Sequence, residues 1–381
     1  MIKLKHLEFY NSPRLGRYTR FDLDLSKQFF ILTGYNGAGK SRMISILTEM
    51  LEGSGSGKFN SPLSHWGCKV VLSNEAICRS LKMEMGGASR DDVAKLSTKF
   101  RRHELTLDKM FHAAKEMVDS RSKTRYTSDA DADVVEHFCI NGSYSPGASV
   151  QKTPSAVDVR SYVNLVSFID ESLYFNFSIN GAEVAPEGKA GESNIDKTLW
   201  LLIHAYMAKR LDGDGFSDLY KKIQSFERDG DVDLNNSEVK SLIALAVEKL
   251  RDSSDVESGA IFTEINKFYG MTNRKLVWRD DTFQMVVPDE GVIPFPAFSK
   301  GEKTLLALLL AVSLYGDSSV FLLDEPDLSL HVEWQRMLLP AMQRLAPESQ
   351  FIIGTHSPFL IMNTQSETIV NLAKKFKEEV K

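Results

Sequence analysis

The eight residues GYNGAGKS, from Gly34 to Ser41, constrain the fold of this chain more than any other segment. They match the pattern G-x-x-x-x-G-K-S in full. An apolar run at 27–34 precedes them, and a stretch at 42–51 with apolar residues at helical spacing follows. The glycines let backbone N–H groups curl around an anion, and the helix adds the positive end of its dipole. This order of strand, glycine loop and helix predicts a phosphate-binding loop in an α/β fold.

The side chains of such a loop have separate tasks. Lys40 is expected to reach the β- and γ-phosphates of a nucleotide, and the Ser41 hydroxyl to ligate Mg²⁺. We therefore expect ATP and Mg²⁺ as ligands. The residues predicted to bind the nucleotide here are Gly34, Asn36, Gly37, Ala38, Gly39, Lys40 and Ser41.

The segment VFLLDE at 320–325 reads as a short buried strand that ends in two acids. Ligands bind at the carboxyl ends of parallel strands in open α/β sheets. Asp324 is therefore predicted to hold Mg²⁺, directly or through water, and Glu325 to polarise the attacking water. Apolar strands that end in acids are common, so this interpretation depends on the phosphate loop and on the residues that follow.

A further apolar strand, within FIIGTHSP at 351–358, ends at a threonine and a histidine. A lone histidine is more often structural. His356, however, follows the acidic strand by one helix and one strand, which favours a catalytic role as a γ-phosphate sensor, beside Glu325 and Lys40. Asp327 to His331 lies just beyond the acids, and two interpretations stay open: a loop that spans a dimer, or a helix-capping turn.

The segment SKGEK at 299–303 precedes a strongly apolar helix. Ser299, Gly301 and Glu302 lie at the start of that helix, where an anion is stabilised. Because the chain already has a phosphate loop, we expect this second helix start to face the nucleotide of another subunit. A capping box formed by Ser299 and Glu302 is an alternative that is compatible with this role.

These motifs, in this order, resemble those of ABC-type ATPases of the SMC/RecF/OLD-like group. The string at Gly34–Ser41 resembles the Walker A loop, 299–303 the signature, 320–325 Walker B, 326–331 the D-loop and 355–358 the H-loop. DEP-x-x-x-LH followed by THSP resembles most closely the OLD-like ATPase subunits of prokaryotic phage-defence systems such as Septu or PARIS. The resemblance implies a homodimer with two sandwiched ATP molecules, and a separate nuclease or toxin as effector.

The sequence departs from the pattern of this group in two ways. Lys300 stands where the signature usually has a small residue, and its ammonium group is a further candidate for phosphate binding. The glutamine of a Q-loop cannot be placed, although Gln151 is a candidate. The chain ends soon after 358, so we expect no fused C-terminal TOPRIM nuclease and assign any second activity to another protein.

The predicted architecture is an α/β P-loop NTPase fold: an ABC-type ATPase head with a mainly helical insertion. Strand patterns occur at 2–9, 17–25, 159–170, 172–179 and 366–372, a hairpin pattern at 274–288, and helical patterns at 91–119 and 195–270. The predicted segments are an ATPase lobe at 1–52, a variable insertion at 53–156, core strands at 157–184, a helical insertion at 185–272 and a second ATPase lobe at 273–381.

Composition narrows the function less than the motifs do. A net charge of −5 gives no general reason to expect nucleic acid as a ligand. A RecF- or SMC-like DNA-binding ATPase in repair remains the alternative, with basic stretches at 99–103 and 114–125. Three cysteines without C-x-x-C spacing indicate neither disulfides nor a zinc site. With no signal peptide and no apolar run long enough to cross a bilayer, we expect a soluble cytoplasmic protein.

Overall fold

The computed structural model describes residues 2–14, 17–51, 65–85, 95, 109, 134–142, 163–169, 172–175, 194–211, 259–280, 282–288, 290–317, 319–362 and 369–372. The chain divides into two compact units. The first comprises Met1–Phe177, Asp317–Leu328 and Glu348–Lys381, and the second comprises Ser178–Gly316 and Ser329–Pro347. The fold is α/β, with a mainly parallel sheet that carries the phosphate loop.

The first unit contains a six-stranded sheet. Its strands are β3 (Phe29–Thr33), β7 (Asn164–Ile169), β8 (Ser172–Phe175), β12 (Ser319–Asp324), β13 (Gln350–Gly354) and β14 (Ile369–Asn371). Their order is β14-β3-β13-β12-β7-β8, and every pair except β7 and β8 is parallel. The central strands are continuous apolar runs, as expected of parallel strands buried on both faces. Because β13 lies between β3 and β12, the carboxyl ends of these three strands lie side by side.

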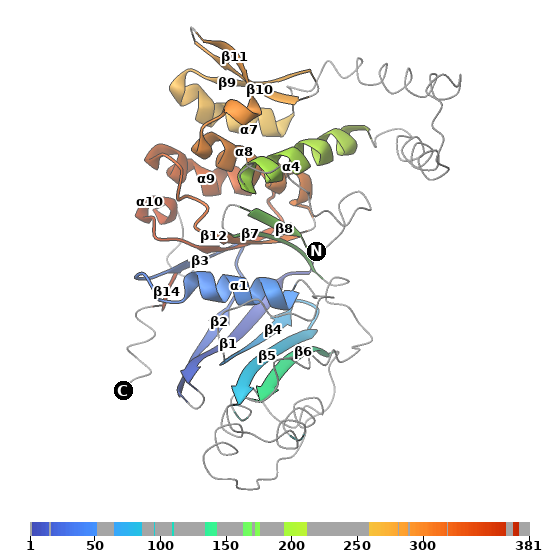
Figure 1. The fold of residues 1–381 in the computed structure, drawn as a ribbon, viewed down its shortest axis with the longest axis vertical. Helices are drawn as coiled ribbons and strands as arrows, with labels where there is room; N and C mark the ends of the chain where they lie inside the picture. Colours follow the sequence, from blue (N-terminus) through green and yellow to red (C-terminus); the bar gives the residue numbers. More distant parts are fainter. Residues whose placement is uncertain are drawn as a thin grey trace, which may run out of the picture. The chain divides into compact units, whose positions relative to one another are not determined.

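A second sheet of the same unit has five strands in the order β2-β1-β4-β5-β6. They are β1 (Leu4–Arg14), β2 (Arg17–Asp24), β4 (His65–Leu72), β5 (Ile77–Met85) and β6 (Val134–Gly142). Helix α1 (Lys40–Leu51) lies between the two sheets (Figure 1) and buries Leu47 and Met50 in the same apolar core as Phe9 and Trp66. Gln350 joins the sheets, since its side chain hydrogen-bonds both the N–H and the C=O of Leu4, each at 2.8 Å.

The sequence pattern missed part of this second sheet. The strand pattern predicted at 2–9 ends too early: β1 continues to Arg14, because β2 and β4 pair with its two edges. The segment 53–156, expected to be a variable insertion, supplies β4, β5 and β6. Of the helical pattern at 91–119, only Lys95 and Lys109 lie within the described residues. Gln151 and the basic stretches at 99–103 and 114–125 lie outside them.

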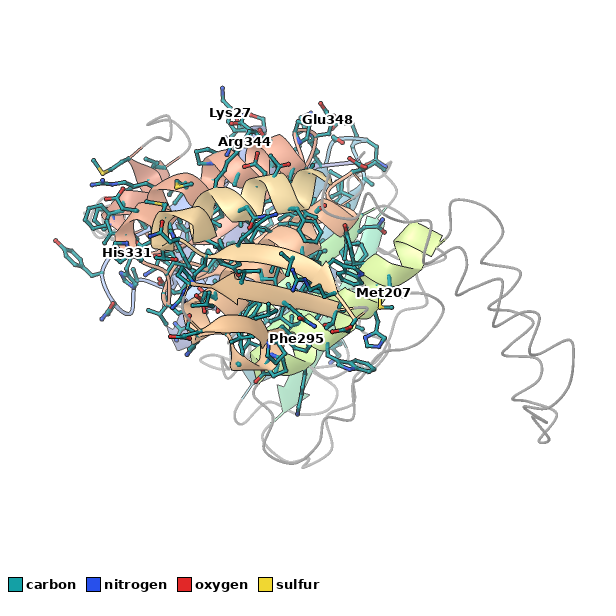
Figure 2. The ribbon with its side chains drawn as sticks, turned by 90° about the horizontal axis from the view of Figure 1, so that it is seen from above. Lys27, Met207, Phe295, His331, Arg344 and Glu348 are labelled. Atoms are coloured by element: carbon teal, nitrogen blue, oxygen red, sulfur yellow. The ribbon has the colours of Figure 1, made fainter. Side chains whose placement is uncertain are left out.

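The second unit combines helices with a three-stranded antiparallel sheet in the order β11-β10-β9. Its elements are α4 (Asn194–Leu211), α7 (Ala260–Tyr269), the 3-10 turn η4 (Gly270–Thr272), β9 (Lys275–Arg279), β10 (Thr282–Val287), β11 (Gly291–Pro294), η5 (Phe295–Ala297), α8 (Lys300–Tyr315) and α9 (Val332–Leu345). Figure 2 shows α7 beside this sheet. The predicted hairpin at 274–288 is therefore present as β9 and β10, with β11 as a third strand.

Aromatic side chains hold α4 and α7 against this sheet. Phe283 of β10 packs on Phe262 with ring centroids 5.4 Å apart, on Tyr206 at 5.5 Å and on Trp278 at 4.9 Å. Such contacts bury large apolar areas and favour tilted or edge-on ring arrangements. None of the described helices is both long enough and apolar enough to cross a membrane.

Candidate active site

The loop between β3 and α1 has the backbone geometry of a phosphate cradle. Gly34, Gly37 and Gly39 have φ angles of 141°, 80° and 96°, in the region that side chains with a Cβ rarely adopt. A Cβ at Gly37 or Gly39 would meet no atom within 4 Å, so backbone conformation and not space requires glycine there. The Ala38 N–H donates to the Tyr35 carbonyl at 3.0 Å, which closes a tight turn before the helix.

Lys40, the first residue of α1, is 4% exposed. Its Nζ lies 3.4 Å from the Gly34 carbonyl oxygen and 2.5 Å from His356 Nε2. Burial lowers the pKa of Lys40, and the nearby carboxylates of Glu325 and Asp324 oppose that shift. The ammonium group is thus aimed across the loop toward the ends of β12 and β13.

Glu325 and His356 complete a group of three polar side chains with Lys40. Glu325 Oε1 lies 3.9 Å from Lys40 Nζ and 3.5 Å from His356 Nε2, and the His356 backbone N–H donates to Glu325 Oε2 at 3.2 Å. Glu325 has φ of 46°, a left-handed conformation that few non-glycine residues adopt. The Glu325 N–H donates to the carbonyl of Gly354 at 2.8 Å, which fixes this turn against the end of β13. The structure thus brings together the three residues that the sequence predicted to be catalytic.

The two predicted magnesium ligands lie on neighbouring elements. Ser41 is exposed in the first turn of α1, and Asp324 ends β12. A Cβ at Gly354 would lie 2.8 Å from Ile44 Cδ1 and 3.1 Å from Asp324 Oδ1, so glycine leaves the space that the Asp324 carboxylate occupies. A hydroxyl and a carboxylate oxygen fit Mg²⁺, which takes one or two protein carboxylates and completes its octahedron with water and substrate phosphates.

The predicted second phosphate site lies at the start of α8. Ser299 is its N-cap and forms a full capping box: Glu302 N–H donates to Ser299 Oγ at 3.4 Å, and Ser299 N–H donates to Glu302 Oε2 at 2.7 Å. The other carboxylate oxygen of Glu302 accepts from Arg274 Nη1. Glu302 is 2% exposed. Both oxygens of its carboxylate therefore have a structural role, which leaves Ser299 and Gly301 as the predicted phosphate contacts.

The segment from Asp327 to His331 leads into helix α9, and its last residue caps that helix. His331 is the N-cap of α9, and its Nδ1 accepts from the Glu333 N–H at 3.4 Å. At the other end, Asp327 Oδ1 accepts from the Thr355 hydroxyl at 2.7 Å. Burial raises the pKa of Asp327, and the hydrogen bond from Thr355 opposes that shift. The role of this segment in a dimer stays a prediction.

Two side chains were not identified from the sequence: Thr355 beside the predicted catalytic His356, and Arg274 beside Glu302 of the predicted signature segment. Thr355 was noted only as the end of a strand, and Arg274 only as the start of a hairpin. The adjacency of Thr355 to His356 was a usable signal for the first. No local pattern indicated that Arg274 would meet Glu302, because the two residues are joined by a tertiary contact between the start of β9 and the start of α8.

A phosphate loop after β3, an acidic strand end on β12 and a histidine after the strand between them define the class of this protein. The chain has a P-loop α/β fold and carries its motifs in the order found in ABC-type ATPases. Residues 203–363 match the family model described as "AAA domain, putative AbiEii toxin, Type IV TA system". That match begins in α4 and ends after the His356 turn, and does not include the phosphate loop.

Three relatives resemble parts of the chain. It is 30% identical to "Retron Ec83 probable ATPase" of Escherichia coli over 34% of this chain and 27% of the relative. It is also 30% identical to "Retron Vc95 probable ATPase" of Vibrio cholerae serotype O1 biovar El Tor, over 35% of this chain and 30% of the relative. Identity to "Septu protein PtuA" of Bacillus thuringiensis is 24%, over 25% and 28%. The chain thus spans less than a third of the length of each relative.

Solved structures with a similar backbone include SMC head domains. One is an SMC head bound to the C-winged helix domain of ScpA, at a TM-score of 0.43 and 12% identity, covering 97% of each chain. Another is the SMC head domain from Thermotoga maritima, at a TM-score of 0.40 and 14% identity, covering 94% of this chain and 91% of that one.

Proposed function

We propose that this chain binds ATP with Mg²⁺ and hydrolyses it to ADP and phosphate. The observation that carries the proposal is the convergence of Lys40, Glu325 and His356 within 2.5–3.9 Å of one another, in the segments that follow three adjacent parallel strands. Two nitrogen groups and one carboxylate suit a reaction in which negative charge is held in place while a water is activated.

Each side chain has a distinct task in the proposed reaction. Lys40 and His356 hold the γ-phosphate, and the glycine loop holds the other phosphates with its N–H groups. Glu325 accepts a proton from the attacking water. The water oxygen bonds to the γ-phosphorus while the bond between the γ-phosphorus and the β,γ-bridging oxygen breaks, and ADP leaves. Mg²⁺, held by Ser41 and Asp324, would neutralise charge on the phosphate oxygens.

The first test separates binding from turnover. Glu325→Gln keeps the size of the side chain and removes the base, so we expect ATP affinity within about threefold of the parent and turnover lower by about 10²–10⁴-fold. Lys40→Ala should abolish detectable ATP binding, whereas Lys5→Ala, in an exposed pair with Glu75 on the same unit, should not change it. Normal turnover in the Glu325→Gln variant would refute the assignment of the base.

We also propose that the chain acts as a homodimer in which Ser299 and Gly301 of one copy face the nucleotide of the other. The exposed N-cap at Ser299 and the neutralisation of Glu302 by Arg274 support this arrangement, because a helix start of that kind favours an anion. The ATP-bound Glu325→Gln variant should then run as a dimer in size-exclusion chromatography with light scattering.

A mixing experiment tests the composite site directly. Lys40→Ala and Ser299→Glu variants should each be inactive alone. Mixed dimers would contain one intact site, made of Lys40 from one copy and Ser299 from the other. Random pairing predicts recovery of roughly a quarter of the parent activity. If the mixture stays as inactive as its components, each chain holds its complete site.

We propose that the ATPase cycle controls a separate effector, a nuclease or toxin, in antiphage defence. The motif resemblance to defence ATPase subunits and the similarity to two retron ATPases and a Septu protein support this role. The segments 53–156 and 185–272 are the proposed partner surfaces. Co-purification with the product of an adjacent gene, and loss of phage protection in the Glu325→Gln variant, would support it. Salt-sensitive DNA binding by the protein alone would instead favour the DNA-repair alternative.

A further inference from the structure

Two polar side chains next to the proposed catalytic group are buried and have no task in the hydrolysis described above. Asp327 is 4% exposed and Thr355 is fully buried. Burying a carboxylate costs free energy unless hydrogen bonds compensate. The Thr355 hydroxyl donates to Asp327 Oδ1 at 2.7 Å, which places the two side chains in direct contact across 28 residues of sequence.

The Thr355 hydroxyl also accepts a hydrogen bond. The Ser357 N–H donates to Thr355 Oγ1 at 2.9 Å. A hydroxyl has one hydrogen to give, and here it goes to the carboxylate, while a lone pair takes the Ser357 N–H. One oxygen atom therefore joins the loop after β12 to the turn after β13 through two hydrogen bonds.

The proposed catalytic residues lie inside the loops that this oxygen joins. Glu325 is two residues before Asp327, and His356 stands between Thr355 and Ser357. The Thr355 N–H also donates to the Leu32 carbonyl at 3.1 Å, which ties the same turn to β3, the strand that leads into the phosphate loop. The left-handed conformation of Glu325 needs such support, because a strained backbone persists only where its surroundings hold it.

We propose that Thr355 and Asp327 are positioning residues, whose hydrogen bond sets the direction of the His356 ring relative to the Glu325 carboxylate. Neither side chain touches the nucleotide in this scheme. The proposal rests on the hydrolysis described above. It adds that the 3.5 Å separation between His356 Nε2 and Glu325 Oε1 depends on a hydroxyl one residue away from the histidine.

The experiment uses the full chain with a matched pair of variants. Thr355→Val removes the hydroxyl and keeps the volume, while Thr355→Ser keeps the hydroxyl. Because a displacement of about 1 Å costs up to about 100-fold in rate, we expect kcat of the Val variant to fall about 10- to 100-fold, with ATP affinity changed less than about threefold. The Ser variant should retain kcat within about threefold of the parent.

The combination with a change at the other partner tests whether the two side chains act through one bond. Asp327→Ala removes the acceptor of this hydrogen bond, and Thr355→Val removes its donor. The two changes combined should therefore lose no more activity than the more damaging single change, because each removes the same hydrogen bond. Multiplying losses would overturn the proposal. So would equal losses in the Val and Ser variants, since the packing of the methyl group and not the hydroxyl would then be responsible.

A second readout does not depend on hydrolysis. In protein with isotope-labelled histidine rings, the His356 signal is assigned by its loss in His356→Asn. Thr355→Val should shift that signal, and Thr355→Ser should leave it near its original position. An unshifted signal in the Val variant overturns the positioning role. If the signal shifts but the parent chain neither binds nor hydrolyses ATP, the proposed function falls and the control of His356 by Thr355 stands.

Discussion

Gly301, the second residue of α8, offers a sharp test of how the predicted signature segment is built. A Cβ added there would lie 2.6 Å from the backbone oxygen of Ser329, a distance that real Cβ atoms essentially never show. Ser329 is itself held, since its Oγ donates to Oγ1 of Thr304, a residue that is 2% exposed, at 3.2 Å. We therefore expect Gly301→Ala to destabilise the protein, although alanine is the better helix former.

The magnitude follows from two opposing effects. Overpacking of a tight contact costs about 1–3 kcal/mol when backbone must move. Replacing glycine by alanine within a helix gains up to about 1 kcal/mol, and less in the first turn. The net expectation is a loss of about 1–2 kcal/mol in the free energy of unfolding.

Gly270 is the matched control in the same unit. Its φ is −59°, and a Cβ there would meet nothing within 4 Å. Gly270→Ala should therefore be neutral or stabilise by up to about 1 kcal/mol. Urea and thermal unfolding of the nucleotide-free chain measure both variants. Gly301→Ala with the stability of the parent would refute the argument from the Ser329 contact, as would equal losses in the two variants.

Two further predictions concern buried carboxylates of the second unit. Arg274→Ala leaves Glu302, with its side chain 3% exposed, without the guanidinium and should cost about 2 kcal/mol, whereas Lys5→Ala breaks an exposed pair and should cost less than about 1 kcal/mol. Equal losses in urea unfolding would contradict the difference in burial. Burial raises the pKa of Glu264, but the hydrogen bonds from Arg344, which lies beside α7 (Figure 2), and from Lys267 outweigh it and leave that pKa below 4.5. Because the folded-state pKa is depressed, the stabilisation is present above pH 4.5 and is lost as the pH falls through the lower, folded value. The difference in the free energy of unfolding between the parent and Glu264→Gln should therefore become smaller in acid. A difference that stays constant in urea unfolding at several pH values would refute this.

The strands and helices around the phosphate site were largely predictable. The apolar runs before Gly34 and before Asp324 became β3 and β12, and the capping-box alternative at Ser299 is confirmed. These elements follow from local chemistry: a short apolar run bounded by turn residues, or a serine three residues before a glutamate. The five-stranded sheet was not predicted, because its strands carry mixed side chains and pair with partners far away in the sequence, such as Leu4 with Leu72.

Local sequence patterns were enough to predict the phosphate loop, the acids at the end of one buried strand and the histidine after another. Each of these depends on backbone conformation and on neighbours a few residues away. No local pattern showed that β13 lies between β3 and β12, an arrangement that brings Lys40, Glu325 and His356 together. The contact between Thr355 and Asp327 was equally hidden, because the partner of a buried polar group depends on which strands lie side by side in the folded protein and is not encoded by local spacing.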